Sequence, residues 1–504
     1  MQERYIATVD LGTSKLALCV AKIIGENVQI IYYKERPSSG IRYNRVFNPK
    51  LAAGPLKVAI AEAEEELNIK ILQVVVGLPR FHVRQETASA TIERSDPAAL
   101  IEDEEISTLK NIALDTYPLG SKDELIYGAV PQSFSTEDVI GSEEDVVGTC
   151  SDSLAGNYKI FVSDMRAVRN VDIMLNLAGV ALAQAIFVPS AVGEAVLKND
   201  EMTNGVALIE MGAGVTSLSI YQGGIMRYYA SIPFGGKSIT TDIRLECAFD
   251  DALAENVKLA FGACLPDKLQ TMGDKVIQIN DEENGTYEHL SVKYLSEIIT
   301  SRCKEIMTAI LYLIQESSFA DRLRCGIVLT GGCANLANLT NMIKDMSGYN
   351  VRVGFPLARK FSSDGCPGIG EAEASASVGM VLEAAADPYL NCIEEAVRPE
   401  DKKEEDAVKI ENPDDKPVET DNQGQGSLFN ENDFDRVVKT KIVKEPAKTR
   451  KKDKKPKPER NKESKGDGLF HVLWTKVGNV LSDGFDDVLG NLYDDMGNPE
   501  KEEK

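Results

Sequence analysis

Two strand–turn–strand patterns that lie far apart in the sequence constrain the fold of this chain more than any other feature. The first reads YIATVDLGTSKLALCVAKI and the second reads GVALIEMGAGVTSLSIYQGG. Each begins with an apolar strand that ends in an acidic residue, Asp10 or Glu210, and continues through a glycine-containing turn into a second strand. One such pattern alone is an ordinary β-hairpin, whereas two copies favour a repeated unit with a shared function.

Both turns have the composition of a phosphate site. A tight glycine turn directs several backbone N–H groups at one anion, and a carboxylate at the end of a strand holds Mg²⁺ through its water ligands. We therefore predict that Asp10 and Glu210 bind the metal. The residues predicted to surround the phosphates are Asp10, Gly12, Thr13, Ser14 and Lys15 in the first turn and Glu210, Gly212, Ala213, Gly214, Val215 and Thr216 in the second. Neither turn has the spacing of a P-loop or of a Rossmann turn.

The composition of the chain excludes several classes of protein. A net charge of −23 over 504 residues argues against nucleic acid as the main partner, because a polyanion requires a basic surface. The nine cysteines and three histidines are scattered, which disfavours a disulfide framework and a structural zinc site. No long apolar run predicts a membrane span, and the N-terminus lacks the pattern of a secretory signal. We therefore expect a cytoplasmic protein.

The chain changes character near residue 390. Before this point, β-rich runs alternate with helical patterns, which predicts an α/β protein with helices packed on mixed sheets. Residues 391–466 are rich in Lys, Glu, Asp and Pro and are predicted to form a disordered linker. The charge changes sign within this stretch: residues 394–435 hold 15 acidic and 5 basic side chains, whereas residues 436–465 hold 14 basic and 4 acidic ones.

Residues 467–493 have apolar side chains at steps of three or four, which predicts one amphipathic helix. Such a helix after a linker is suited to insertion into a membrane surface, although docking on the body of the protein or in a partner's groove fits the same pattern. Its polar face is mainly acidic, so residues 436–465 are expected to supply the attraction to an anionic leaflet. The residues predicted to enter the membrane are Phe470, Leu473, Trp474, Val477, Leu481 and Phe485.

A third segment, VLTGGCANL, follows both turns and completes a pattern typical of the actin, sugar-kinase and chaperone ATPase superfamily. Within that superfamily the chain resembles FtsA, an actin-like bacterial division protein, over essentially its whole length. The segments SIPFGGKSITTDIRLECAF and ENVKLAFGACLP are similar to those that carry the nucleotide site of FtsA. For Glu255 and Lys258, a solvated helix face is the alternative. By the resemblance, the further nucleotide-binding residues are Gly235, Gly236, Glu255, Lys258, Gly331, Gly332 and Asn335.

The resemblance to FtsA implies a two-lobed, actin-like α/β fold with an inserted SHS2-type subdomain, a disordered linker and a C-terminal amphipathic helix. The stretch beginning LQVVVGLPRFHVRQETASATI is similar to that inserted subdomain, which in FtsA serves self-assembly and the recruitment of later division proteins. The implied subdomains are 1A (residues 1–71, 166–200 and 355–390), 1C (residues 72–165), 2A (residues 201–242 and 325–354) and 2B (residues 243–324).

The same resemblance implies a protein that binds ATP with Mg²⁺, polymerises with itself and anchors FtsZ filaments to the membrane. The expected location is the cytoplasmic face of the inner cell membrane at the division site. The C-terminal peptide of FtsZ is expected to dock on residues 243–324, where Lys293 and Arg302 offer positive charge; the alternative is that both are ordinary surface cations. An anionic membrane surface and other division proteins are the remaining expected partners.

Hydrolysis of ATP is expected to be slow or absent. Relatives often carry Gln or Glu after the strand AQAIFVP, where this chain has Val188 and Pro189, and the nearby Glu194 fits a solvated or capping role. Glu210 and Ala213 also stand where the family usually has Asp and Gly. A metabolic kinase of the same superfamily is one alternative, but no catalytic base has a definable partner. A PilM-like pilus assembly protein is another, and such proteins normally lack a C-terminal anchor.

Overall fold

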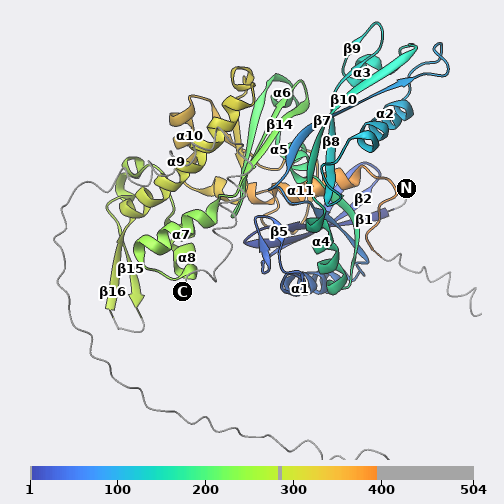
Figure 1. The fold of residues 1–504 in the computed structure, drawn as a ribbon. Coiled ribbons are helices and arrows are strands. Elements are labelled where there is room, and N and C mark those ends of the chain that lie inside the picture. The colour runs from blue at the N-terminus through green and yellow to red at the C-terminus, as the bar shows by residue number, and fades with distance from the viewer. Residues whose placement is uncertain (1–2, 282–285, 394–504) are drawn as a thin grey trace, which may run out of the picture. The chain divides into compact units, whose positions relative to one another are not determined.

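The computed structural model describes residues 3–281 and 286–393 (Figure 1). The chain divides into two compact units, Met1–Lys409 and Ile410–Lys504, and every described residue belongs to the first unit. The amphipathic helix predicted for residues 467–493, and all but the first three residues of the predicted linker, lie outside the described residues. None of the helices described is long and apolar enough to cross a bilayer.

The first sheet has six strands in the order β11-β6-β1-β2-β3-β19. Strands β1, β2 and β3 form an antiparallel meander, whereas β6 and β11 run parallel to β1. The central strands are continuously apolar because helices α1, α4 and α11 pack against the sheet, with α5 packed on α11. The bounds are β1 (Glu3–Leu11), β2 (Lys15–Ile24), β3 (Asn27–Pro37), β6 (Gln73–Gly77), β11 (Ala181–Ile186), β19 (Ser362–Ser363), α1 (Pro49–Leu67), α4 (Met165–Ala178), α5 (Val188–Val196) and α11 (Ser375–Ala385).

The second sheet, in the order β14-β13-β12-β17-β18, repeats the β3-β2-β1-β6-β11 order of the first. Its first three strands also form an antiparallel meander, and β17 and β18 also run parallel to β12. The repeated sequence pattern therefore corresponds to a repeated sheet topology, in which Asp10 and Glu210 occupy matching positions near the ends of β1 and β12. The bounds are β12 (Val206–Met211), β13 (Thr216–Gln222), β14 (Ile225–Ile232), β17 (Ile327–Thr330) and β18 (Val351–Val353).

Four helices and one hairpin complete the second half of the described chain. Helices α7, α8, α9 and α10 bury one apolar core with the second sheet, and α9 contributes the longest buried stripe. The hairpin of β15 and β16 precedes α9 directly. The bounds are α7 (Gly236–Cys247), α8 (Asp251–Phe261), β15 (Val276–Asp281), β16 (Thr286–Ser291), α9 (Val292–Glu316) and α10 (Leu339–Ser347), and the short elements elsewhere are β4 (Ile41–Arg42), β5 (Arg45–Val46) and α6 (Asn199–Asn204).

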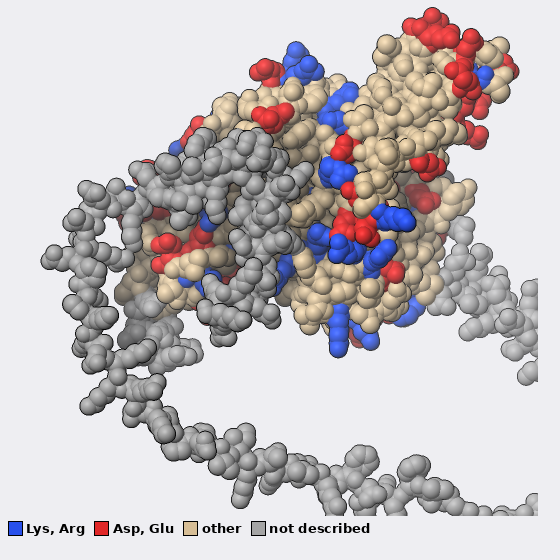
Figure 2. Space-filling view, in the orientation of Figure 1, with Lys and Arg blue, Asp and Glu red and all other residues tan. Residues whose placement is uncertain are grey.

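A third sheet is formed by residues 84–164, which lie in the sequence between β6 and β11 of the first sheet, and it has its own core. Its four antiparallel strands have the order β7-β10-β8-β9, and α2 packs against β7 and β10. Residues 84–164 hold seventeen acidic and five basic side chains, and Figure 2 shows acidic groups gathered over the end that carries α2 and α3. The bounds are β7 (Arg84–Glu93), α2 (Asp103–Thr116), β8 (Glu124–Ser135), β9 (Ile140–Gly141), α3 (Glu143–Val146) and β10 (Ser153–Asp164).

The boundary predicted at residue 72 for the inserted subdomain is wrong by one strand. β6 (Gln73–Gly77) pairs in parallel with β1 and β11 inside the first sheet, and the third sheet begins only with β7. The physical reason lies in the run VVVG, whose members are all buried. A continuous apolar run of this kind is typical of an interior parallel strand covered on both faces.

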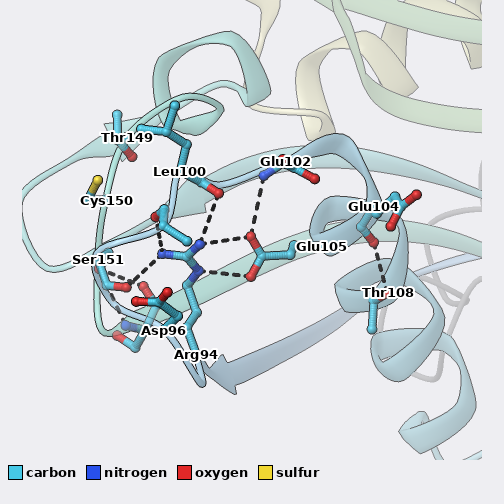
Figure 3. A network of polar contacts seen from close by, with 12 residues as sticks. Arg94, Asp96, Leu100, Glu102, Glu104, Glu105, Thr108, Thr149, Cys150 and Ser151 are labelled. Atoms are coloured by element: carbon cyan, nitrogen blue, oxygen red, sulfur yellow. Dashed lines mark hydrogen bonds and ion pairs between the residues drawn. The ribbon is translucent and has the colours of Figure 1, made fainter.

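Arg94 joins three segments of the third sheet's domain (Figure 3). Its guanidinium donates two hydrogen bonds to the Glu105 carboxylate, at 2.8 and 3.0 Å, and three more to backbone carbonyls of Ala99, Leu100 and Ser151 at 3.0–3.1 Å. All five N–H donors of the side chain are thereby used. The side chain is only 3% exposed, so water does not readily replace these partners.

We predict that Arg94→Met destabilises the third sheet by about 2 kcal/mol, because it leaves Glu105 and three carbonyls without a donor. Hydrogen exchange of the α2 amides in the full chain measures this local effect directly. Arg166→Met is the matched control, since the Arg166 side chain is 73% exposed and makes one ion pair at 3.6 Å. Equal exchange rates in the two variants would contradict the prediction.

Candidate functional site

The two glycine turns meet although they belong to different sheets. A Cβ atom added to Gly214 would lie 2.6 Å from Thr13 Oγ1, so the second turn packs directly on the first. The Thr13 hydroxyl also accepts the N–H of Asn44 at 3.1 Å, and the Lys237 ammonium donates to the Thr13 carbonyl at 3.3 Å. The structure thus brings together the two motifs that the sequence predicted to act as one site.

Each turn is closed by its own backbone. Gly212 N–H donates to the Val215 carbonyl at 2.9 Å, and a Cβ atom on Gly12 would lie 2.3 Å from the Lys15 carbonyl oxygen. Gly12 therefore has to be glycine, because the chain folds back on itself there. Of the other predicted residues, the Ser14 side chain is exposed, whereas the Thr216 hydroxyl is buried and donates to the Phe234 carbonyl at 2.8 Å.

The start of α7 is packed against the second turn. Gly236 N–H donates to the Gly212 carbonyl at 2.9 Å, and Lys237 N–H donates to the Ala213 carbonyl at 2.7 Å. A Cβ atom on Gly235 would lie 2.3 Å from the Gly212 carbonyl oxygen, which leaves no space for any side chain. The double glycine of the motif FGGKSI therefore serves a close approach of helix and turn.

Lys258 and Glu255, on α8, reach the same place. The Lys258 ammonium donates to the Gly236 carbonyl at 3.1 Å, to Thr240 Oγ1 at 2.9 Å and to Glu255 Oε2 at 2.8 Å. The Lys258 residue is 8% exposed. The alternative of a solvated helix face is therefore wrong for Lys258, which fixes α8 to the first turn of α7.

The segment after β17 also borders the second turn. Gly331 has a φ of +86°, and a Cβ atom there would lie 2.7 Å from the Met211 carbonyl oxygen. Cys333 Sγ lies 3.4 Å from the Gly212 carbonyl oxygen. Gly332 and Asn335, at the two ends of a short 3₁₀ helix, are exposed. The residues predicted in VLTGGCANL thus border the second turn, with the Asn335 side chain open to a ligand.

Lys15 connects the first turn to Glu373, which lies beside the segment after β17. Its ammonium lies 2.6 Å from Glu35 Oε1 and 3.1 Å from Glu373 Oε2. Glu373 follows the third segment and lies at 3.9 Å from a Cβ atom built on Gly332. Lys15 is therefore held in two ion pairs, and a phosphate would have to compete with two carboxylates for it.

Arg80 lies between the two carboxylates that were predicted to hold Mg²⁺. Its Nη2 atom donates to Asp10 Oδ1 at 3.2 Å, and its Nε atom lies 3.2 Å from Glu210 Oε2. Burial alone lowers the pKa of the guanidinium, but Glu210 and Asp10 outweigh it and keep that pKa above its ordinary value. Burial raises the pKa of Glu210, while Arg80 acts in the opposite direction.

Mg²⁺ does not fit this arrangement. A metal ion held by Asp10 and Glu210 would have to displace the buried guanidinium from both carboxylates. Among the described residues there is also no group of three or more His, Cys, Asp or Glu side chains able to hold a metal. The metal role predicted for these two residues is therefore not supported. The sequence pattern identifies the two carboxylates but not the arginine that lies between them.

Sequence reasoning missed Arg80 and Lys237. Arg80 stands three residues after the buried strand β6, and β6 runs parallel to β1, so the segment after β6 lies at the same sheet edge as Asp10. The run VVVGLPR was therefore a usable signal that Arg80 follows a buried parallel strand and lies near Asp10. Lys237 follows the double glycine directly, and a lysine beside glycines of a phosphate site is as informative as the glycines themselves.

Val188 and Pro189, at the first positions of α5, are buried and apolar. Glu194 is ion-paired with Lys360 and its side chain is half exposed. Burial raises the pKa of Glu383 on α11 to about 7, with a lowering by a hydrogen bond from Ser190 and a further rise from Glu194. These groups lie on helices and not on either turn.

We predict that stability falls by about 2 kcal/mol as the pH rises from about 5 to 8, since each pKa unit corresponds to about 1.4 kcal/mol and Glu383 is partly solvated. The pKa of Glu383 is about 7 in the folded chain, against an ordinary value of 4.5. The folded state therefore holds a proton that the unfolded state has lost. Urea unfolding of the wild type and of Glu383→Gln across this range measures the effect, which the variant should not show; parallel profiles would contradict it.

The two residues predicted to meet a partner peptide are placed differently. Arg302 on α9 donates to both oxygens of Asp242, at 2.5 and 2.8 Å, and to Glu305 at 2.8 Å. Lys293 is 53% exposed and lies 4.0 Å from Asp267. Lys293 is therefore available to an acidic peptide, whereas Arg302 is already neutralised by two carboxylates.

Comparison with known proteins gives a consistent family likeness. A family described as "Cell division protein FtsA" matches residues 207–379. The cell division protein FtsA of Neisseria meningitidis is 28% identical over 357 residues, which are 70% of this chain and 84% of the relative. The FtsA of Borreliella burgdorferi is 27% identical over 390 residues, which are 76% of this chain and 91% of the relative.

Among solved structures, the PilM-PilN type IV pilus biogenesis complex has a chain that superposes with a TM-score of 0.54 at 17% identity, covering 76% of this chain and 99% of that one. At this identity the likeness shows the fold alone. The described body thus has the actin-like α/β fold expected from the sequence, with two sheets of equal topology that bring two glycine turns together.

Proposed function

Since the chain is a relative of the cell division proteins called FtsA, we propose that it binds ATP at the two turns and links FtsZ filaments to the membrane. In this proposal the body recognises nucleotide and FtsZ, and residues 436–504 recognise the cytoplasmic face of the inner membrane. Self-assembly into filaments and the recruitment of other division proteins complete the role.

The observation that carries the nucleotide proposal is the direct contact of the turns at Gly214 and Thr13. Each turn alone is an ordinary hairpin, but two turns in contact can direct backbone N–H groups at one polyphosphate from two sides. The glycines at positions 235, 236 and 331 keep side chains out of the same place. Lys237, exposed beside Thr13, adds a positive charge.

For the partner peptide, the helix α9 and the hairpin before it supply a surface with Lys293 at its start. We propose that Lys293, and not Arg302, offers the free charge to the acidic C-terminal peptide of FtsZ. The third sheet, with seventeen acidic side chains in residues 84–164, is proposed as the inserted SHS2-type subdomain that meets other copies and later division proteins. A surface of that charge favours partners with basic faces.

The membrane part of the proposal comes from the sequence. The basic residues between 436 and 465 suit an anionic surface, because each Lys or Arg near such a surface contributes roughly 1 kcal/mol. In the helix predicted for residues 467–493, the apolar residues from Phe470 to Phe485 would share one face and supply the insertion. The basic residues or the apolar residues alone would anchor the chain weakly, and the two together would hold it at the membrane surface.

Calorimetric titration of the full chain with ATP, and with adenosine as the comparison, tests the nucleotide proposal. Phosphate recognition by the turns should give saturable binding of ATP and binding of adenosine at least about tenfold weaker, which corresponds to 1.4 kcal/mol. Equal affinities would mean that the turns do not hold phosphate. Absence of ATP binding would remove nucleotide from the proposed function.

A further inference from the structure

Arg80 is a buried charge of the site that the proposed function does not use. It leaves the first sheet after β6, beside the end of β1, and its side chain crosses to the end of β12 in the second sheet. It thus touches Asp10 and Glu210, the two acidic residues of the duplicated motif. An arginine in this position bridges the same two groups that a divalent cation would bridge.

The position of Arg80 is fixed from its backbone as well as from its side chain. The Tyr229 hydroxyl donates to the Arg80 carbonyl, and Tyr229 N–H donates to Gln85 Oε1 at 2.9 Å. The Tyr229 ring packs edge-on against Phe161 and Phe187, with centroids 5.9 and 5.2 Å away. The Arg80 side chain is 7% exposed. It is therefore a built part of the site and not a surface arginine that happens to lie near it.

One N–H group of the guanidinium also lacks a hydrogen-bond partner. Its Nε atom is near Glu210 but is not aligned for a hydrogen bond, and it is one of the few buried side-chain nitrogens or oxygens in the described part of the chain without a hydrogen-bond partner. A guanidinium carries five N–H groups in a planar fork that suits phosphate oxygens. The Arg80 side chain is already largely desolvated, so an anion bound beside the two turns could gain its positive charge at little further loss of solvation.

We propose that Arg80 is the resident counter-ion of the phosphate site: it contacts the polyphosphate of a nucleoside triphosphate and makes binding independent of a divalent metal ion. This inference rests on the proposed nucleotide function of the two turns. The phosphate would otherwise meet two carboxylates with no intervening charge. Arg80 neutralises part of that repulsion, and the backbone N–H groups of the turns and Lys237 supply the remaining attraction.

The same arrangement favours binding without turnover. Phosphoryl transfer depends on a metal ion that neutralises charge on the phosphate oxygens and on a group that orients the attacking water. Arg80 stands where the carboxylates would hold the metal, and Val188 and Pro189 supply no polar side chain for the water. The arrangement therefore favours binding of ATP over its hydrolysis.

Calorimetric titration of the full chain with ATP, in Mg²⁺ and in EDTA, tests this inference. The affinity of the wild type for ATP in Mg²⁺ and in EDTA should differ by less than about threefold. This is well below the tenfold difference that corresponds to about 1.4 kcal/mol. Arg80→Met keeps the length of the side chain but removes its charge. It should bind ATP at least about tenfold more weakly in EDTA and recover part of the loss in Mg²⁺, because Asp10 and Glu210 are then free for the metal.

Arg84→Met is the matched control, since Arg84 is four residues away and 41% exposed and pairs with Glu86 and Glu124. It should bind ATP as the wild type does. A thermal melt checks that Arg80→Met is folded; if it is not, the wild-type comparison together with Arg80→Lys, which keeps charge but not the fork, decides the matter. Arg80→Lys should bind between the wild type and the methionine variant in EDTA.

Three results would overturn the inference. Loss of wild-type affinity by about tenfold or more in EDTA would show metal dependence, and would leave the nucleotide function standing. Wild-type affinity in EDTA for a folded Arg80→Met would remove the role of Arg80 and leave the nucleotide function standing. If Arg80→Met does not fold, wild-type affinity in EDTA for Arg80→Lys would have the same meaning. Absence of ATP binding by the wild type under both conditions would remove the nucleotide function and this inference with it.

Discussion

Replacement of Gly235 by alanine is expected to weaken ATP binding at least about tenfold, because overpacking at such a contact costs 1–3 kcal/mol. A Cβ atom at this position would lie 2.3 Å from the Gly212 carbonyl oxygen and 2.9 Å from the carbonyl group of Ala213. All of these are backbone atoms, so no side-chain rotation relieves the contact. The start of α7 or the second turn must move, and the hydrogen bond from Gly236 N–H to the Gly212 carbonyl is lost with it.

Calorimetric titration with ATP measures the loss, and Gly54→Ala is the matched control. Gly54 lies inside α1, and a Cβ atom there meets nothing within 4 Å. That variant should bind ATP unchanged, because α1 lies outside the two turns and the start of α7. Wild-type affinity in Gly235→Ala would show that the spacing of α7 and the turn does not matter for the ligand.

Replacement of Lys258 by methionine is expected to destabilise the folded chain by about 3 kcal/mol, as is usual when one partner of a buried, hydrogen-bonded charge is removed. The variant leaves the Gly236 carbonyl and Thr240 Oγ1 without their donor and Glu255 without its cation. Because α8 is held to α7 by these bonds, the start of α7 loses its support. Thermal unfolding of the full chain, followed by circular dichroism, should show a lower midpoint.

Lys268→Met serves as the control for Lys258→Met. Lys268 forms one ion pair, with Asp345 at 2.7 Å, and its side chain is 50% exposed. Exposed pairs of this kind contribute at most about 1 kcal/mol, so its midpoint should stay near that of the wild type. Equal midpoints for the two variants would mean that Lys258 is not a structural clamp.

The sequence was sufficient to predict the paired turns and the fold class. Alternation of apolar residues, an acidic strand end and a glycine turn are local signals, and they occur twice, so the residues themselves indicate that the sheet is duplicated. These features depend on chain-local geometry.

The sequence was insufficient wherever side chains from separate segments meet. In the sequence, Lys258 is one of several charged residues on an amphipathic helix. Only the packing of α8 against α7 shows that its ammonium is buried and bonded to Gly236. Arg80 was overlooked because the stretch from residue 72 was assigned to an inserted subdomain, and β6 in fact belongs to the first sheet beside Asp10. Arg302 looked like a free cation, and only the packing of α9 on α7 shows its pairing with Asp242.

Co-sedimentation with liposomes tests the central claim, that this chain links FtsZ filaments to a membrane. The full chain, a chain ending at residue 466 and the single variant Trp474→Glu are mixed with FtsZ, ATP and vesicles that contain anionic lipid. Only the full chain should carry FtsZ into the lipid fraction, because the shortened chain lacks the apolar residues predicted to enter the membrane and Trp474→Glu places a charge among them. FtsZ that stays in solution with the full chain, or that sediments equally well without residues 467–504, would contradict it.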